Sequence, residues 1–78
     1  MQAIAYTEIV DFVSSGPSLK AIVDFRPSTL TLGRVAWLEQ LEQQARLNAD
    51  ESFELQEFRK ARDFLEALKL RAARRLKS

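Results

Sequence analysis

The chain has only two glycines and two prolines among its 78 residues, and this scarcity limits the folds open to it. β-Sandwiches and barrels need many tight turns, which Gly and Pro usually supply. Helices joined by a few loops need far fewer such residues. The sequence therefore predicts an all-α fold in which short helices precede one long C-terminal amphipathic helix. These helices would form a helical hairpin or a small bundle, alone or completed by dimerisation.

A chain of this length forms at most one domain, which we place over residues 1–78. A core of this size rarely supplies more than roughly 3 to 5 kcal/mol, so small proteins often add disulfides, a metal or a partner. The sequence has no Cys and no His, which excludes disulfides, zinc fingers and thiol nucleophiles. Association is the support that remains, either with a second copy or with another protein.

The first half of the chain predicts short elements. Residues 1–17 contain an apolar cluster, and they read as a short helix or a strand ending at Ser14-Ser15-Gly16-Pro17. Ser18 can cap a short helix that runs through Phe25. Arg26-Pro27 then forces an extended break, because proline disfavours a helical conformation in the residue before it.

A third helix is predicted from Thr29 to Arg46, although Gly33 weakens it by roughly 1 kcal/mol relative to Ala. We expect Trp37 to lie in the core. The apolar residues assigned to the broad buried side of this helix are Leu30, Leu32, Val35, Trp37, Leu38, Leu41 and Ala45.

The long helix is predicted over residues 49–76. Asn48 and Glu51 have the spacing of a capping box, in which each side chain accepts a hydrogen bond from the other residue's amide. A helix of this length would span roughly 42 Å at 1.5 Å per residue. Its basic end should therefore project beyond the core. The predicted apolar positions are Phe53, Leu55, Phe58, Ala61, Phe64, Leu65, Leu68, Ala72 and Leu76.

Charge is distributed unevenly along the chain. Residues 1–58 carry a net charge of −5, whereas residues 59–78 carry +6. The bases near the C-terminus can stabilise the helix dipole, steer an acidic protein partner or grip nucleic-acid phosphates. No aromatic residue lies among these bases, so the stacking platform of single-strand binders is missing. Nucleic-acid binding is thus disfavoured but stays open.

Neither a metal site nor a catalytic centre is predicted. Asp50, Glu51, Glu54 and Glu57 share a helical segment, but helical di-metal sites also use His, which the chain lacks. These acids are better explained as a solvated first turn that the helix dipole favours. Nucleophile motifs are absent, and two isolated glycines cannot build a phosphate-binding loop. We expect no cofactor and no enzymatic activity.

The sequence contains no apolar stretch long enough to span a membrane, and no basic region leading into a hydrophobic signal core. These features predict a cytoplasmic protein with no membrane partner.

Several short motifs stand out: Phe25-Arg26-Pro27-Ser28, Arg34-Val35, Leu47, Glu51, Glu54-Leu55, Glu57-Phe58 and Leu68-Lys69-x-Arg71-Ala72. Together they resemble a family of short helical bacterial proteins that are encoded beside small toxin nucleases and are regarded as prospective antitoxins. The likeness covers about residues 22–72. The family's usual Gly, Thr and Pro around Leu47 are replaced here by Arg46, Asn48 and Ala49, and Leu70 stands where the family has Ala.

This resemblance implies a protein-binding module that neutralises a co-expressed toxin nuclease. Its long helix could lay an apolar face in a groove of the partner while carboxylates face the basic nuclease cleft. The alternatives are a homodimeric helical interaction protein and a weak nucleic-acid binder that uses the basic end. The predicted partner-binding residues are Glu51, Glu54, Glu57, Phe58, Leu65, Leu68, Arg71, Arg74, Arg75 and Leu76.

Overall fold

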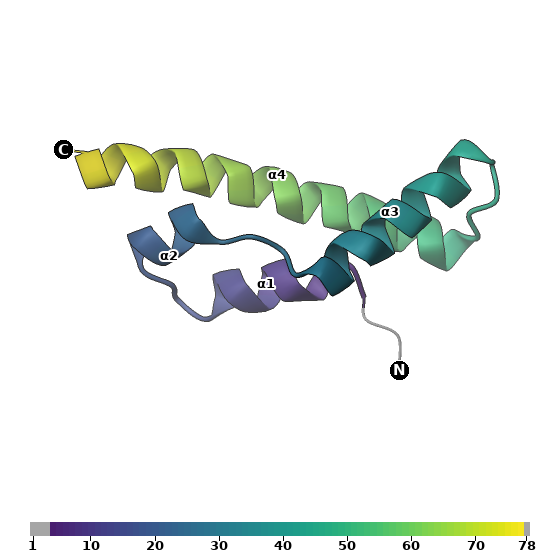
Figure 1. The fold of residues 1–78 in the computed structure, drawn as a ribbon, viewed down its shortest axis with the longest axis horizontal. Coiled ribbons are helices and arrows are strands. Elements are labelled where there is room, and N and C mark those ends of the chain that lie inside the picture. The colour runs from purple at the N-terminus through teal and green to yellow at the C-terminus, as the bar shows by residue number, and fades with distance from the viewer. Residues whose placement is uncertain (1–3, 78) are drawn as a thin grey trace.

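The structure, a computed structural model, describes residues 4–77 and is all-α over that range (Figure 1). It confirms the predicted fold class, with short helices followed by one long C-terminal helix. The described part of the chain measures 47 × 24 × 18 Å along its principal axes. The helices are α1 (Thr7–Ser14), α2 (Leu19–Asp24), α3 (Thr29–Gln43) and α4 (Ala49–Lys77).

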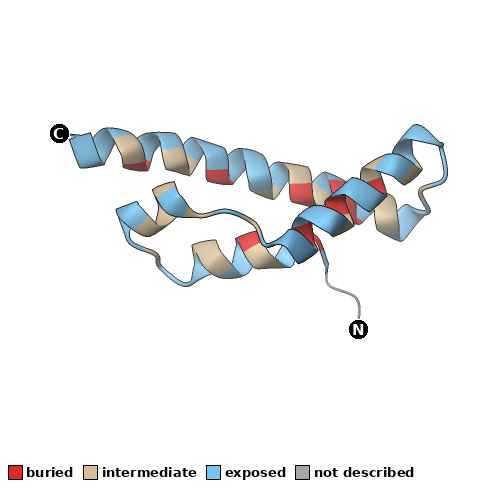
Figure 2. Cartoon of the chain, viewed as in Figure 1, coloured by how far each residue is buried: buried red, intermediate tan, exposed pale blue. Residues whose placement is uncertain are grey.

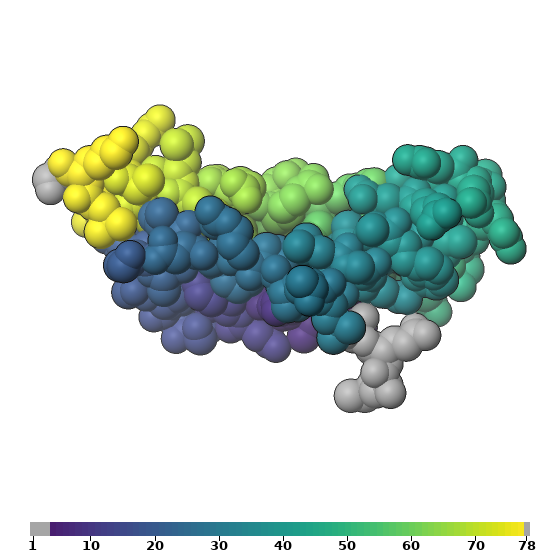
Figure 3. All heavy atoms as spheres, in the orientation of Figure 1, coloured from purple at the N-terminus to yellow at the C-terminus, as the bar shows by residue number. Residues whose placement is uncertain are grey.

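Helix α4 is the support on which the other helices pack. It runs along one long side of the molecule, and α1, α2 and α3 each contact it (Figures 1 and 3). In Figure 1, α1 runs in the same direction as α4, whereas α2 and α3 run in the opposite direction. The arrangement is therefore a long α3–α4 hairpin whose open end is filled by the two N-terminal helices.

The core lies along the side of α4 that faces the other helices (Figure 2). Phe58 and Leu65 contribute from α4, and both are almost fully buried. Tyr6, Phe12, Val13, Phe25, Leu47 and Ala61 pack around the core while staying partly exposed. The buried members of the core cluster are Ala5, Ile9, Val35, Leu38, Leu55, Phe58 and Leu65.

Residues 7–14 form a helix, which settles the open choice between helix and strand for this segment. Ile9 points into the core. The helix ends at Ser14, and Gly16 follows with φ of +69°. Glycine suits this position because a left-handed backbone costs it little. The prediction for residues 1–17 also covered residues 1–3, which lie outside the described residues.

The short helix and the break after it follow the sequence prediction. The Ser18 hydroxyl accepts a hydrogen bond from the Ala21 amide at 3.1 Å and caps α2. Phe25 is already extended, and no helix forms again before Thr29. Lys69 Nζ donates a 2.8 Å hydrogen bond to the Phe25 carbonyl, which joins the end of α2 to α4.

Helix α3 ends at Gln43, three residues before the predicted Arg46. Ala45 adopts φ of +57°, the Ala45 amide donates to Glu42 O, and the Arg46 amide donates to Leu41 O at 2.9 Å. This pair of bonds is a Schellman motif. Alanine occupies the left-handed position that glycine usually takes, so the helix stop carried no glycine signal.

The predicted buried side of α3 is wrong in part. Thr31, Val35 and Leu38 face the core, whereas Leu30, Leu32 and Trp37 are exposed. Trp37 retains 43% of its accessible surface, so the core assignment of this residue is incorrect. The reason is geometric, because a packed helix buries one narrow strip and the apolar residues here surround more than half of the helix.

Helix α4 begins with the predicted capping box. The Glu51 amide donates to Asn48 Oδ1 at 2.7 Å, and the Asn48 amide donates to Glu51 Oε1 at 3.0 Å. The helix continues to Lys77, and Ala72 is buried near its far end. Residues 74–77 are exposed, and the end of α4 extends past α2 in Figure 1.

Candidate protein-binding surface

Two residues predicted to anchor a partner, Phe58 and Leu65, are inside the protein's own core. They retain 3% and 2% of their accessible surface. They therefore stabilise the fold, and in this conformation a partner cannot reach them. Leu68 is half-buried, while Leu76 is exposed on the last turn of α4.

The three predicted acidic contacts divide among three different roles. Glu51 belongs to the capping box, and Glu57 is half-buried and pairs with Lys60 at 3.0 Å. Glu54 is buried and serves an internal network. Glu51 and Glu57 are both half-buried, so a partner could contact part of either carboxylate.

Glu54 joins three parts of the chain. Its carboxylate accepts hydrogen bonds from Arg34 Nε at 2.9 Å and Nη2 at 2.8 Å, and from the Ala5 amide at 2.8 Å. The bonds to Arg34 are the main reason that the pKa of Glu54 is lowered; burial opposes this shift and the Ala5 amide supports it. Arg34 in turn lies 4.7 Å from the centre of the Trp37 ring. The network fastens the N-terminal segment to α3 and α4.

The basic end of α4 is exposed, as the sequence predicted. Arg71, Arg74 and Arg75 lie at the surface of the last two turns. Lys69 differs from them because it is half-buried and bonded to the Phe25 carbonyl. Lys69 therefore has a structural role, whereas the three arginines lie at the surface.

A groove with a volume of about 850 Å³ lies between α1 and the start of α3. We call it the α1–α3 groove. Among the described residues, its lining includes the carboxylates of Glu8 and Asp11 and no basic residue. The lining residues are Ile4, Thr7, Glu8, Asp11, Phe12, Ser15, Phe25, Ser28, Leu30 and Thr31.

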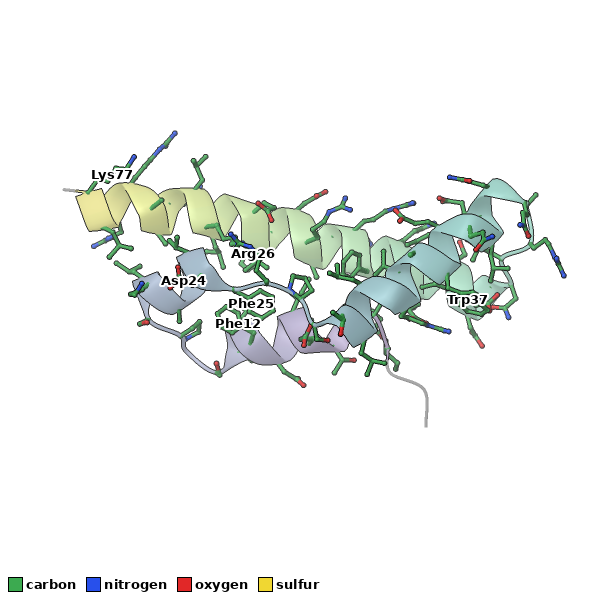
Figure 4. All side chains as sticks on the ribbon, in the orientation of Figure 1. Phe12, Asp24, Phe25, Arg26, Trp37 and Lys77 are labelled. Carbon is green, nitrogen blue, oxygen red and sulfur yellow. The ribbon has the colours of Figure 1, made fainter. Side chains whose placement is uncertain are left out.

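The α1–α3 groove has a fixed floor and an exposed apolar wall. The rings of Phe12 and Phe25 stack with centroids 4.2 Å apart, and Figure 4 shows them side by side between α1 and the α2–α3 link. Glu8 Oε1 accepts a 2.7 Å hydrogen bond from the Ser28 amide and holds the two walls together. Leu30 retains 71% of its surface and stands on the α3 side.

A second, smaller groove runs between α1 and α4 and has a volume of about 390 Å³. We call it the α1–α4 groove. Val10 and Phe64 keep 47% and 56% of their surfaces beside it. Its lining residues are Tyr6, Ile9, Val10, Val13, Ser14, Glu57, Lys60, Ala61 and Phe64.

Among residues 4–77, no group of three or more carboxylate side chains is arranged to hold a metal ion. Within the same range, no helix combines the length and apolar content that a bilayer crossing requires.

Comparison of the chain with protein-family models, with curated proteins and with solved structures found no match.

Sequence reasoning missed the α1–α3 groove. It lies between Phe12 and Leu30, which are far apart in the chain, and it exists only because α1 docks beside the start of α3. One signal was available in the sequence. Leu30 and Trp37 are seven residues apart, and Val35 and Leu38 form a separate strip, so α3 could not bury both strips against one neighbour.

Proposed function

We propose that this protein is a non-catalytic protein-binding module, and that it binds a basic protein partner through the α1–α3 groove. The observation that supports this most directly is the lining of the groove. Ile4, Phe12 and Leu30 offer apolar contact, while Glu8 and Asp11 contribute the only charged side chains among the described lining residues. An apolar site bordered by carboxylates suits a partner that presents lysine or arginine beside an apolar residue.

The family resemblance narrows the proposed partner to a co-expressed toxin nuclease. A nuclease must bind nucleic-acid phosphates, so its cleft carries an excess of cations. Carboxylates on an antitoxin can occupy such a cleft in place of the substrate. In this proposal the contacting carboxylates are Glu8 and Asp11, because both line the groove, whereas Glu51 and Glu54 do not. Glu8 also accepts a hydrogen bond from the Ser28 amide. The exposed arginines of α4 would lie outside this contact.

The proposal includes no chemical step by this chain. It has neither His nor Cys, and the described carboxylates nearest the core are paired, as Glu54 is with Arg34. A protein that neutralises an RNA-cleaving toxin would act in the cytoplasm, where that toxin meets its substrate.

Co-expression with the product of the neighbouring gene tests the proposal. We expect the two proteins to co-purify, and the neighbour to lose its toxicity or become soluble. Leu30→Glu and Asp11→Arg should each abolish the complex, because both residues line the groove and both are exposed.

Leu32→Glu is the matched control, since Leu32 is also an exposed leucine of α3 but does not line the groove. It should leave the complex intact. A complex that survives Leu30→Glu, or retention of the protein on a phosphate-rich column at moderate salt with no protein partner, would contradict the proposal.

A further inference from the structure

One face of α4 is only partly covered by the described part of the chain, where Tyr6 contacts the edge of Phe53 and α1 borders Phe64. Phe53 and Phe64 keep 59% and 56% of their surfaces, although both belong to the longest helix. Residues four and seven positions from Phe64 lie on its side of a helix, as does Phe53, eleven positions before it. We call this set the α4 strip, which consists of Phe53, Glu57, Lys60, Phe64, Leu68 and Arg71.

Two of the three charged residues of the α4 strip lie symmetrically about Phe64, and the third, Lys60, forms an ion pair with Glu57 at 3.0 Å. Glu57 precedes Phe64 by seven positions, and Arg71 follows it by seven. At 1.5 Å per residue, each charge lies about 10 Å along the helix from Phe64, on the same face. A two-fold axis through Phe64 would therefore bring Glu57 of one helix opposite Arg71 of an antiparallel second helix, and this pairing would occur twice.

The charge of the whole helix favours the same orientation. Between residues 49 and 58 the charged residues are four acids, and between residues 69 and 77 they are five bases. An antiparallel pair aligns the acidic part of each helix with the basic part of the other. A parallel pair would instead place Glu57 against Glu57 and Arg71 against Arg71, and both contacts would be repulsive.

From this symmetry we infer that the occupant of the α4 strip is a second copy of this chain, which forms a two-fold antiparallel dimer centred on Phe64. Val10 and Val13 of α1 flank Phe64 in the α1–α4 groove, so the partner's helix would also contact α1. The contact would supply the apolar burial that a thin core lacks. It shares no residue with the α1–α3 groove and does not rest on the proposed function.

Sedimentation of the full-length chain, with circular dichroism as a check of folding, tests this dimer. We expect Glu57→Arg to raise the dissociation constant by about 100-fold or more, because arginine would then face Arg71 at two symmetric positions. Arg71→Glu should have a similar effect. The double variant Glu57→Arg/Arg71→Glu should restore the dissociation constant to within about tenfold of wild type, because it exchanges the two charges.

Glu66→Arg is the matched control, since Glu66 is an exposed acid of α4 outside the strip. It should leave the dissociation constant unchanged, as should Leu30→Glu in the other groove. A wild-type chain that is monomeric at about 1 mM overturns the inference, because association weaker than that is negligible. If the double variant does not restore the dimer, Glu57 does not pair with Arg71 of the second copy, and the inference is overturned.

The orientation can be tested separately, because the chain has no cysteine and introduced thiols are therefore unique. Mixed Glu57→Cys and Arg71→Cys chains should form a disulfide between the two variants. In the antiparallel dimer the two copies of position 57 would be about 21 Å apart along the axis, so Glu57→Cys alone should not crosslink. Efficient crosslinking of Glu57→Cys with itself would show a parallel pair and refute the dimer geometry. The dimer would also be refuted if the wild-type chain is monomeric and binds a foreign protein that the Phe64→Glu variant no longer binds.

Discussion

The Glu54 network allows a quantitative prediction. Replacing Glu54 with Leu removes both hydrogen bonds to Arg34 and leaves the Ala5 amide without its acceptor. Breaking a buried ion pair on one side usually costs about 3 to 5 kcal/mol. The Arg34 and Glu54 side chains keep 17% and 10% exposure, so Arg34 can regain some water, and we expect about 3 kcal/mol.

This loss is comparable to the whole stability of a small single core, roughly 3 to 5 kcal/mol. It should lower the melting temperature by roughly 12 to 24 °C if the variant remains folded. Urea and thermal unfolding followed by circular dichroism at pH 7 measure both quantities. Because self-association raises apparent stability, the variants must be compared at one chain concentration.

The double variant Arg34→Leu/Glu54→Leu is the control for this prediction. Replacing both partners with apolar residues removes the buried unpaired charge, so most of the lost stability should return. The Ala5 amide remains unpaired, which should leave a deficit of about 1 kcal/mol. If Glu54→Leu unfolds within about 0.5 kcal/mol of wild type, or if the double variant is no more stable than the single one, the network does not hold the helices together.

The remaining predictions concern acid pH, the core and two backbone positions. The folded-state pKa of Glu54 lies below its ordinary value of 4.5. Its contribution to the free energy of unfolding is therefore complete above pH 4.5 and is lost as the pH falls through the lowered pKa. In acid titrations of stability, Glu54→Gln should show a smaller loss than wild type. Phe58→Ala should cost about 3 to 5 kcal/mol in urea unfolding. Gly33→Ala should raise stability by up to about 1 kcal/mol, since nothing lies within 4 Å of the added Cβ. Ala45→Gly should also stabilise, by about 1 kcal/mol, by relieving the positive φ; a lower melting temperature for either variant contradicts its prediction.

Local signals predicted the helices well. Ser18, Ser28 and Asn48 each mark a helix start, because their short polar side chains accept hydrogen bonds from amides of the first turn. The proline at position 27 marked the break before α3. Helix ends were harder to place, because Ala45 takes a left-handed conformation that its residue type does not announce.

The surfaces could not be predicted in the same way. Whether an apolar residue is buried depends on which neighbour packs against its face, and the described helices leave Trp37 and Leu30 exposed. The sequence predicted that Glu54 is a solvated acid, because its partner Arg34 lies twenty residues earlier in the chain. The N-terminal segment could not have been expected at that carboxylate, since Ala5 lies 49 residues away in the chain.

The packing of α1 and α2 on α4 has a consequence for how the chain acquires its structure on the ribosome. Helices of eight and six residues are too short to persist alone in water. The surface that stabilises them belongs to α4, which is translated after them. The N-terminal helices should thus remain unfolded until α4 has been translated and has left the exit tunnel, and only then dock. Nascent chains arrested before residue 49 should accordingly be cleaved readily by protease, whereas released full-length chains should resist it.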